Sequence, residues 1–249
     1  VQANGSSVSG TQNFFQGVAC GVFADGGPTQ AVLSWQGGEW GKSGVELLTV
    51  PSMVDSTTIH PISQGEGLSA GDIDGDGDLD VYQGTRWLRN DAGTWTSFQS
   101  STIGGDKTPT GTPDRNRLVD MDLDGDLDAV VGFSHFSGAT NDLYWLENPT
   151  DPTQLWPVHT IGQNLGGGWS LDAADMDRDG DVDVVLGEHW GNGAVYVFEN
   201  DGLGATFTQH LVDPGGVGID HHDGARLFDI DRDGDLDILS IGWYNDKVW

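Results

Sequence analysis

DMDRDGDVD, spanning Asp175–Asp183, is one of four nonapeptides that repeat the pattern Asp-x-Asp-x-Asp-Gly-Asp-x-Asp in this chain. The others are DIDGDGDLD (Asp72–Asp80), DMDLDGDLD (Asp120–Asp128) and DIDRDGDLD (Asp229–Asp237). A half-buried strand with this pattern would crowd five like charges on one face, where they repel each other. A tight loop around a hard cation instead turns alternate side chains toward one ion, and Ca²⁺ takes roughly six to eight oxygen ligands. The pattern therefore predicts four calcium loops.

The spacing also predicts the ligand roles within each loop. Positions one, three, five and nine offer carboxylates, and position seven is expected to offer its backbone carbonyl. Position six is Gly77, Gly125, Gly180 or Gly234, and glycine adopts the positive φ of a sharp turn without strain. Mg²⁺ prefers fewer protein ligands and stricter octahedral geometry, so Ca²⁺ is favoured, at about four ions per chain. The candidate metal residues are Asp72, Asp74, Asp76, Asp78, Asp80, Asp120, Asp122, Asp124, Asp126, Asp128, Asp175, Asp177, Asp179, Asp181, Asp183, Asp229, Asp231, Asp233, Asp235 and Asp237.

The four loops recur at an even period. Their first aspartates are 48, 55 and 54 positions apart, which is typical of a propeller or a repeat array. Short apolar segments flank each loop, such as LSAG before and VYQG after the first, and two more follow, giving four strands per repeat. An upstream segment, GVACGVFADGGPTQAVLSW, has the same layout. With Gly21, Phe23, Asp25, Gly27 and Thr29 in the carboxylate register, only Asp25 is acidic, so this copy is expected to hold no calcium.

The loop, the VVxG-like tail after it and the four-strand repeat resemble the FG-GAP/VCBS-type repeats of integrin-α-like and bacterial extracellular propellers. The resemblance covers residues 11–249. In that family the calcium loop joins the first and second strands of a blade. The resemblance thus implies an all-β fold, a β-propeller of about five four-stranded blades with calcium loops in four of them. The family includes adhesion receptors, lectin-like modules and domains of polysaccharide-degrading enzymes, so it implies fold and metal better than activity.

The two ends of the chain suggest how such a propeller would close. Residues 1–249 are expected to form a single β-propeller domain, and the chain stops at DKVW, within the third strand of the last blade. Residues 1–15 are predicted to complete that blade, which would remove exposed sheet edges. Two alternatives are a fragment of a larger propeller and head-to-tail self-association, in which one chain's start completes its neighbour's end.

Composition narrows the partners and the location. The formal net charge is −29, from 39 acidic and 10 basic residues, which disfavours nucleic acid and anionic membranes as partners. The sequence has no stretch long enough for membrane insertion. Cys20 is the only cysteine, so no intrachain disulfide forms and calcium is expected to act as the staple. Millimolar external calcium fills weak sites of this kind, which favours an extracellular location, secreted or at the cell surface.

A ligand site is predicted on the face opposite the calcium loops. The chain has 10 Trp, and an aromatic residue is expected near the end of each blade's second strand, as a wedge between blades or a platform for a sugar ring: Trp35, Trp87, Phe136, Trp190 and Trp243. The segment GIDHHDG is the densest polar cluster outside the calcium loops. Binding residues concentrate on variable loops held by a rigid scaffold. The predicted ligand contacts are Glu188, His189, Trp190, His221, His222 and Asp223.

Three functions are compatible with these patterns. The favoured one is a calcium-stabilised extracellular binding or adhesion module for polysaccharide or a protein surface on a cell. The second is a polysaccharide lyase or glycoside hydrolase domain, for which the residues nominate no catalytic set; a lyase needs a base and a neutralising cation, and basic residues are scarce here. The third is a structural subunit of a head-to-tail extracellular assembly. Catalysis is therefore undecided and less favoured than binding.

Overall fold

The computed structural model is an all-β structure. It describes residues 13–37, 44–50, 56–64, 67–103, 112–134, 141–188, 193–219, 221, 225–242 and 247–249. These residues form strands β1–β18, joined by turns and bends, and they contain no helix, as expected of an all-β fold. No helix in this part of the chain therefore meets the length and apolarity needed to cross a membrane.

The first four sheets are antiparallel meanders of four strands, in which spatial order follows the chain. The first contains β1 (Asn13–Gly21), β2 (Gln30–Gly37), β3 (Val45–Thr49) and β4 (Ser56–His60). The second contains β5 (Leu68–Gly71), β6 (Asp80–Gln83), β7 (Arg86–Asp91) and β8 (Thr94–Gln99). Each corresponds to one predicted repeat, so the four-stranded blade is confirmed.

The third sheet contains β9 (Thr112–Val119), β10 (Asp128–Ser134), β11 (Asn141–Leu146) and β12 (Val158–Leu165). The fourth contains β13 (Gly168–Ala174), β14 (Asp183–Glu188), β15 (Val195–Asn200) and β16 (Phe207–Asp213). The fifth is a two-stranded sheet of β17 (Arg226–Phe228) and β18 (Asp237–Leu239). Each Asp-rich nonapeptide connects the first and second strands of a sheet, as expected.

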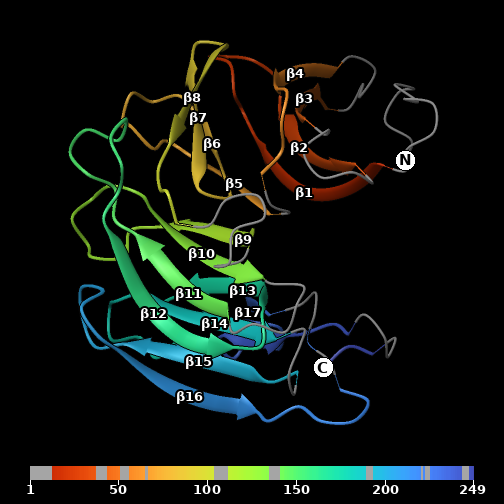
Figure 1. The fold of residues 1–249 in the computed structure, drawn as a ribbon, viewed down its shortest axis with the longest axis vertical. Helices are drawn as coiled ribbons and strands as arrows, with labels where there is room; N and C mark the ends of the chain where they lie inside the picture. The colour runs from red at the N-terminus through yellow and green to blue at the C-terminus, as the bar shows by residue number, and fades with distance from the viewer. Residues whose placement is uncertain are drawn as a thin grey trace.

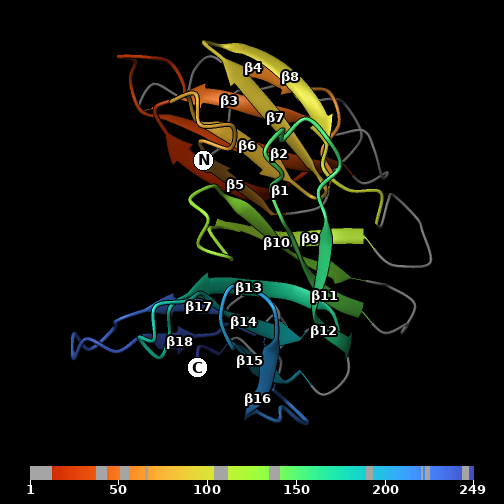
Figure 2. The ribbon, with the colours of Figure 1, turned by 90° about the vertical axis from the view of Figure 1, so that its left-hand side faces the viewer.

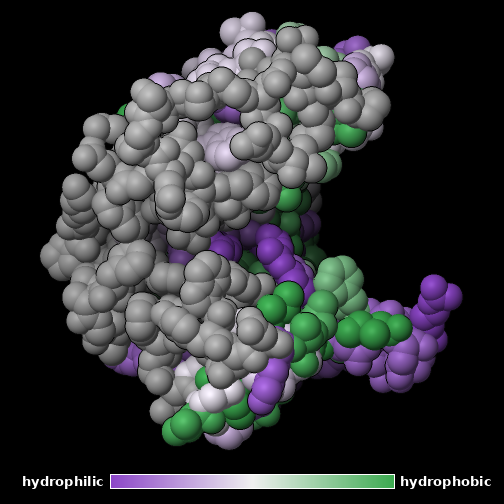
Figure 3. Space-filling view, turned by 90° about the vertical axis from the view of Figure 1, so that its right-hand side faces the viewer, coloured by the Kyte–Doolittle hydropathy of each residue, from purple (hydrophilic) through white to green (hydrophobic). Residues whose placement is uncertain are grey.

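The sheets follow one another around an arc (Figure 1). Their first strands are neighbours in the series β1, β5, β9, β13 and β17, so the first strand of each sheet lies beside that of the next. Seen from the side, the sheets are stacked, and the connections between first and second strands project on one side of the stack (Figure 2). The space-filling view shows an outline hollowed between the upper and lower parts of the arc (Figure 3). This is the blade arrangement of a propeller.

The hydrophobic core lies between the sheets. Leu68 and Val81 of the second sheet pack with Val32 of the first, and Val130 and Leu186 share a cluster between the third and fourth sheets. Further clusters fill the space between the second and third sheets and between the fourth and fifth. Because the second and fourth sheets each pack against a neighbour on both faces, their second strands β6 and β14 are buried at every position. Packing between blades therefore supplies the burial that a single blade lacks.

The aromatic wedge interpretation holds in part. Trp87 is fully buried and stacks on Phe98, with ring centroids 5.2 Å apart. However, Trp87 lies on the third strand of its sheet, β7, and not at the end of the second strand, because the turn after β6 is short. Trp35 lies on β2 and is partly buried. The remaining predicted aromatics lie outside the described residues.

The two ends of the chain give a mixed result. The backbone of Trp249 exchanges hydrogen bonds with Ser240, at 2.8 and 3.0 Å, and Val248 forms an isolated antiparallel bridge with Ile241 just after β18. That the last residues belong to a third strand of this blade stays a prediction. Residues 13–15 were expected to complete the last blade, yet they belong to β1, where Asn13 pairs with Gly37 and Phe15 with Trp35. For these three residues the prediction is wrong, because their backbone pairs with β2 of the first sheet. Residues 1–12 lie outside the described residues.

The upstream copy also has a shifted register. Gly21 pairs with Gln30 as Gly71 pairs with Asp80, so the first loop is the nonapeptide from residue 22 to residue 30. Phe23 then takes position two and Asp25 position four, one step from the register expected from sequence. Phe23 is buried and packs in the core between the first two sheets. This loop therefore has the length of the others but none of their alternating carboxylates.

Candidate metal centre

The four acidic loops share one backbone conformation. Position six has a positive φ in each, at 96°, 104°, 103° and 99° for Gly77, Gly125, Gly180 and Gly234. This confirms the role expected of these glycines. Position four also has a positive φ in every loop, although three of its residues are not glycine: Gly75, Leu123, Arg178 and Arg232, at 74°, 61°, 67° and 66°. Two left-handed residues per loop turn the chain back on itself and bring alternate side chains inward.

Three carboxylates converge in each loop. One oxygen from each of positions one, three and nine lies within 4.8 Å of the others. A metal ion that accepts oxygen ligands could be held by each group. The four groups are Asp72, Asp74 and Asp80; Asp120, Asp122 and Asp128; Asp175, Asp177 and Asp183; and Asp229, Asp231 and Asp237.

The loop backbone also donates hydrogen bonds to the carboxylates of positions one and five. Position five accepts a hydrogen bond from the backbone N–H of position seven in all four loops, as Asp124 does from Asp126 at 3.1 Å. Position one accepts the N–H of the position-six glycine, as Asp120 does from Gly125 at 3.1 Å. Position five is not one of the three converging carboxylates, and its role as a metal ligand stays a prediction.

Buried oxygens without partners indicate what the loops lack. In three loops the Oδ1 atom of the position-one aspartate is buried and has no hydrogen-bond partner: Asp72, Asp120 and Asp175. The Oδ1 atoms of Asp74, Asp126 and Asp181 are in the same state. A buried charged oxygen is costly unless it is paired or coordinates a metal. The donor set, all hard oxygens, fits Ca²⁺.

The position-nine aspartate joins its loop to the third strand of the sheet. Asp128 is fully buried, and its Oδ2 accepts the backbone N–H of Met121 at 2.9 Å. Its Oδ1 accepts the backbone N–H of Asn148, which follows β11, at 2.7 Å. The same pair of bonds recurs in the second and fourth sheets, at Asp80 with Ile73 and Asn90, and at Asp183 with Met176 and Asn200.

An asparagine at the end of the third strand then reaches back to the preceding sheet. The Nδ2 atom of Asn90 donates to the Phe23 carbonyl at 2.7 Å, and that of Asn148 donates to the Ile73 carbonyl at 2.9 Å. Each acceptor lies at position two of the preceding sheet's loop. Our reading of the sequence missed these asparagines, although they recur in register in WLRND, WLENP and VFEND. The acidic loops of the second and third sheets are thus coupled to the sheet before them.

Burial and crowding make these loops electrostatically unfavourable without a counter-cation. Burial raises the pKa of Asp80 and of Asp128 to about 7, although backbone N–H groups on both carboxylates oppose the shift. Burial, followed by the neighbouring charge of Asp124, raises the pKa of Asp126 to about 6. Each shift means that the protein disfavours the charged carboxylate. A bound cation would reverse this preference, because opposite charge favours the ionised form.

The predicted ligand contacts are only partly described by the structure. Glu188 is 5% exposed, and its carboxylate accepts backbone N–H groups of Gly166 at 2.6 Å and Ala194 at 3.3 Å. His221 is 2% exposed, and its Nδ1 lies 2.5 Å from Ser240 Oγ. Both residues therefore serve internal contacts and are not surface contacts for a sugar, which corrects the prediction for these two. His189, Trp190, His222 and Asp223 lie outside the described residues.

Comparison with known proteins supports the repeat assignment. The family described as FG-GAP-like repeat matches residues 120–186 and 177–240, so this part of the chain carries two FG-GAP-like repeats. No curated protein matches the chain. A rhamnogalacturonan lyase of Bacillus licheniformis, PL11, is similar with 13% identity and a TM-score of 0.48, over 99% of this chain and 57% of its own. The exotype rhamnogalacturonan lyase YesX is similar with 11% identity and a TM-score of 0.48, over 93% and 54%. The chain spans little more than half the length of these two proteins.

Proposed function

We propose that this chain, whose residues 120–240 carry FG-GAP-like repeats, is an extracellular calcium-stabilised binding module. Each of its four acidic loops would hold one Ca²⁺. The observation that carries the proposal is the convergence of three carboxylates per loop, together with a buried position-one oxygen that has no partner in three of them. Ca²⁺ suits these sites better than Mg²⁺, because it accepts more protein oxygens at less strict geometry.

The ion would be held by the carboxylates of positions one, three and nine, and it would offset their mutual repulsion. Because position nine also binds the asparagine of the third strand, the site connects three strands of one sheet. The asparagine in turn binds the preceding sheet. Calcium bound at one loop would therefore stabilise the interface between two sheets as well as the loop.

An extracellular location follows from the affinity that such sites are expected to have. Extracellular modules bind calcium at roughly 10⁻⁴ to 10⁻³ M, a range that millimolar external calcium saturates and resting cytosol does not. The high negative charge of the chain favours binding of calcium ions and disfavours binding of nucleic acid.

Counting the bound ions tests the calcium proposal directly. Protein stripped of metal and titrated with CaCl₂ in a calorimeter is expected to bind four ions per chain, because four loops have the carboxylate group. Asp120→Ala removes one position-one ligand and should reduce the count to three. Asp25→Ala is the matched control, since it removes an aspartate from the loop that lacks the group, and it should leave four. Fewer than three sites in the unaltered protein, or a count unaffected by Asp120→Ala, would contradict the proposal.

The ligand of the module is proposed to be a polysaccharide or a cell-surface partner. A contact between the fourth sheet and His221 supports a site at this end of the sheet. Ser170 Oγ of β13 donates to the His221 carbonyl at 2.9 Å, and a Cβ at Gly187 of β14 would lie 2.6 Å from that carbonyl. Gly187 and His221, which precede the predicted contacts in sequence, therefore lie side by side. Of these contacts, Trp190 offers a stacking surface and His222 a hydrogen-bonding group.

A glycan array probed with and without calcium tests this second part. Binding to one class of polysaccharide is expected in calcium and is expected to disappear in chelator. Trp190→Ala and His222→Ala should each abolish binding yet keep four calcium ions per chain and an unchanged melting temperature. Normal binding by both variants would move the ligand site elsewhere and leave the calcium proposal intact.

A further inference from the structure

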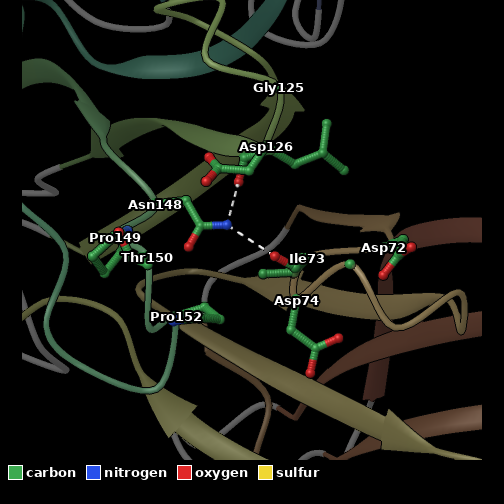
Figure 4. A pocket seen from close by; sticks show the side chains of 11 residues that line it. Asp72, Ile73, Asp74, Gly125, Asp126, Asn148, Pro149, Thr150 and Pro152 are labelled. Atoms are coloured by element: carbon green, nitrogen blue, oxygen red, sulfur yellow. Dashed lines mark hydrogen bonds between the residues drawn. The ribbon is translucent and has the colours of Figure 1, made fainter.

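A pocket of about 220 Å³ separates the first two acidic loops (Figure 4). Asp74 and Gly75 of the first loop line one side of it, and Asp126 of the second loop lines another. The segment from Asn148 to Pro152 forms the remaining wall. The Oδ1 atoms of Asp126 and Asn148 are buried without a hydrogen-bond partner, and neither residue belongs to the three-carboxylate groups. No Lys, Arg or His lines the pocket, so its charged side chains are all acidic.

Asn148 differs from its two counterparts in a way that concerns this pocket. The side-chain oxygen of Asn90 accepts the N–H of Gly93 at 2.8 Å, and that of Asn200 accepts the N–H of Gly204 at 3.0 Å. Asn148 is 4% exposed, and its oxygen has no such cap. In Figure 4 its nitrogen points to Ile73, and its oxygen points away, toward the wall that includes Pro152. A buried carbonyl without a donor is costly, so this oxygen is suited to accept from a ligand.

An arginine joins two consecutive acidic loops elsewhere in this protein. In the third and fourth loops, Arg178 at position four donates to Asp235 at position seven of the next loop, with the two atoms 2.6 Å apart. The same two positions in the first and second loops are Gly75 and Asp126, and both line the pocket. Glycine supplies no side chain here, and a Cβ at Gly75 would meet no atom within 4 Å. By loop position the pocket thus corresponds to the ion pair of Arg178 and Asp235, whose side chains are exposed in the later pair of loops.

We propose that this pocket binds a guanidinium group, presented by an arginine side chain of a partner protein. Asp126 would be its ion-pair partner and the Asn148 carbonyl its second acceptor. A planar guanidinium carries five donors and no acceptor, which suits a pocket lined by unpartnered oxygens. Ile73, Leu127 and the ring of Pro152 also line the pocket and would contact the apolar stem of the side chain. The inference is independent of the proposed sugar site, which is expected at the opposite end of the sheets.

The probe is a blocked arginine, N-acetyl-arginine amide, titrated into isotope-labelled protein in saturating calcium and followed by NMR. The side-chain amide signals of Asn148 should shift with saturation. The citrulline analogue, which has the same shape without the charge, should bind at least tenfold more weakly, because it cannot form the ion pair. Free guanidinium chloride at the same low concentration distinguishes a site for an arginine side chain from a site for the free ion. A site for the side chain should bind the blocked arginine more tightly than guanidinium.

Two variants decide the assignment. Asp126→Asn keeps the shape and should weaken arginine binding at least tenfold, and Gly75→Arg should abolish it by supplying an internal guanidinium, as Arg178 does for Asp235. Asp201→Asn makes the same charge change on the turn between β15 and β16 and should have no effect. Melting temperature and calcium count, measured in parallel, show that each variant is folded and loaded. Unchanged binding in both pocket variants, or equal binding of arginine and citrulline, would overturn the inference whether or not calcium fills the loops.

Discussion

Excess chelator is expected to lower the melting temperature of this protein by more than about 10 °C. One site filled at a hundredfold excess over its Kd contributes about 2.7 kcal/mol, so four such sites approach the whole stability of an ordinary domain. For a chain of this size, each kcal/mol corresponds to roughly 2–4 °C. The structure gives a second reason, because chelation would leave crowded buried carboxylates beside the interfaces between sheets.

Differential scanning calorimetry measures this effect directly. Scans in saturating calcium, in chelator, and in chelator followed by excess calcium should show a loss of thermal stability that is then reversed. Magnesium added in place of calcium is the control for ionic strength and general divalent binding, and it should restore only a minor part. A melting curve that is the same in calcium and in chelator would remove the calcium proposal.

Asp128→Asn is expected to destabilise the calcium-loaded protein by about 3 kcal/mol, because a buried group left without its hydrogen bond costs about 1–3 kcal/mol and a metal ligand is weakened as well. Both oxygens of Asp128 accept backbone N–H groups, from Met121 and Asn148. A carboxamide can accept only one of these, and its nitrogen would face the other N–H, donor against donor. The melting temperature should fall by roughly 6–12 °C.

Asp124→Asn is the matched control for this substitution. It makes the same change four residues earlier in the same loop, where the side chain is exposed and accepts one N–H, that of Asp126, which an amide oxygen can still accept. Its effect should be well below that of Asp128→Asn in thermal or denaturant unfolding with saturating calcium. Equal losses in the two variants would show that loop charge, and not the buried bonds of position nine, determines stability here.

The local parts of the structure were predictable from sequence. The loop conformation depends on nine consecutive residues, in which glycine at position six takes a positive φ, so four copies in register suffice to identify it. The flanking strands were also predictable, because short apolar segments recur at a fixed distance from each loop. The positive φ of Leu123, Arg178 and Arg232 could not be predicted from the sequence. These residue types disfavour that conformation, and only the closure of the loop imposes it.

By itself the sequence determined the repeat, the all-β blades and the four acidic loops, because each depends on neighbours within a few residues. The tertiary structure decided which carboxylates converge, which asparagines join one sheet to the next, and that Glu188 and His221 are buried. Asn90 and Phe23 are 67 residues apart, and Asn148 and Ile73 are 75 apart, so no local pattern shows that they bond. The pocket at Gly75 has the same origin. Gly75 has no side chain to fill this space, and the pocket forms because the second acidic loop places Asp126 on its other side.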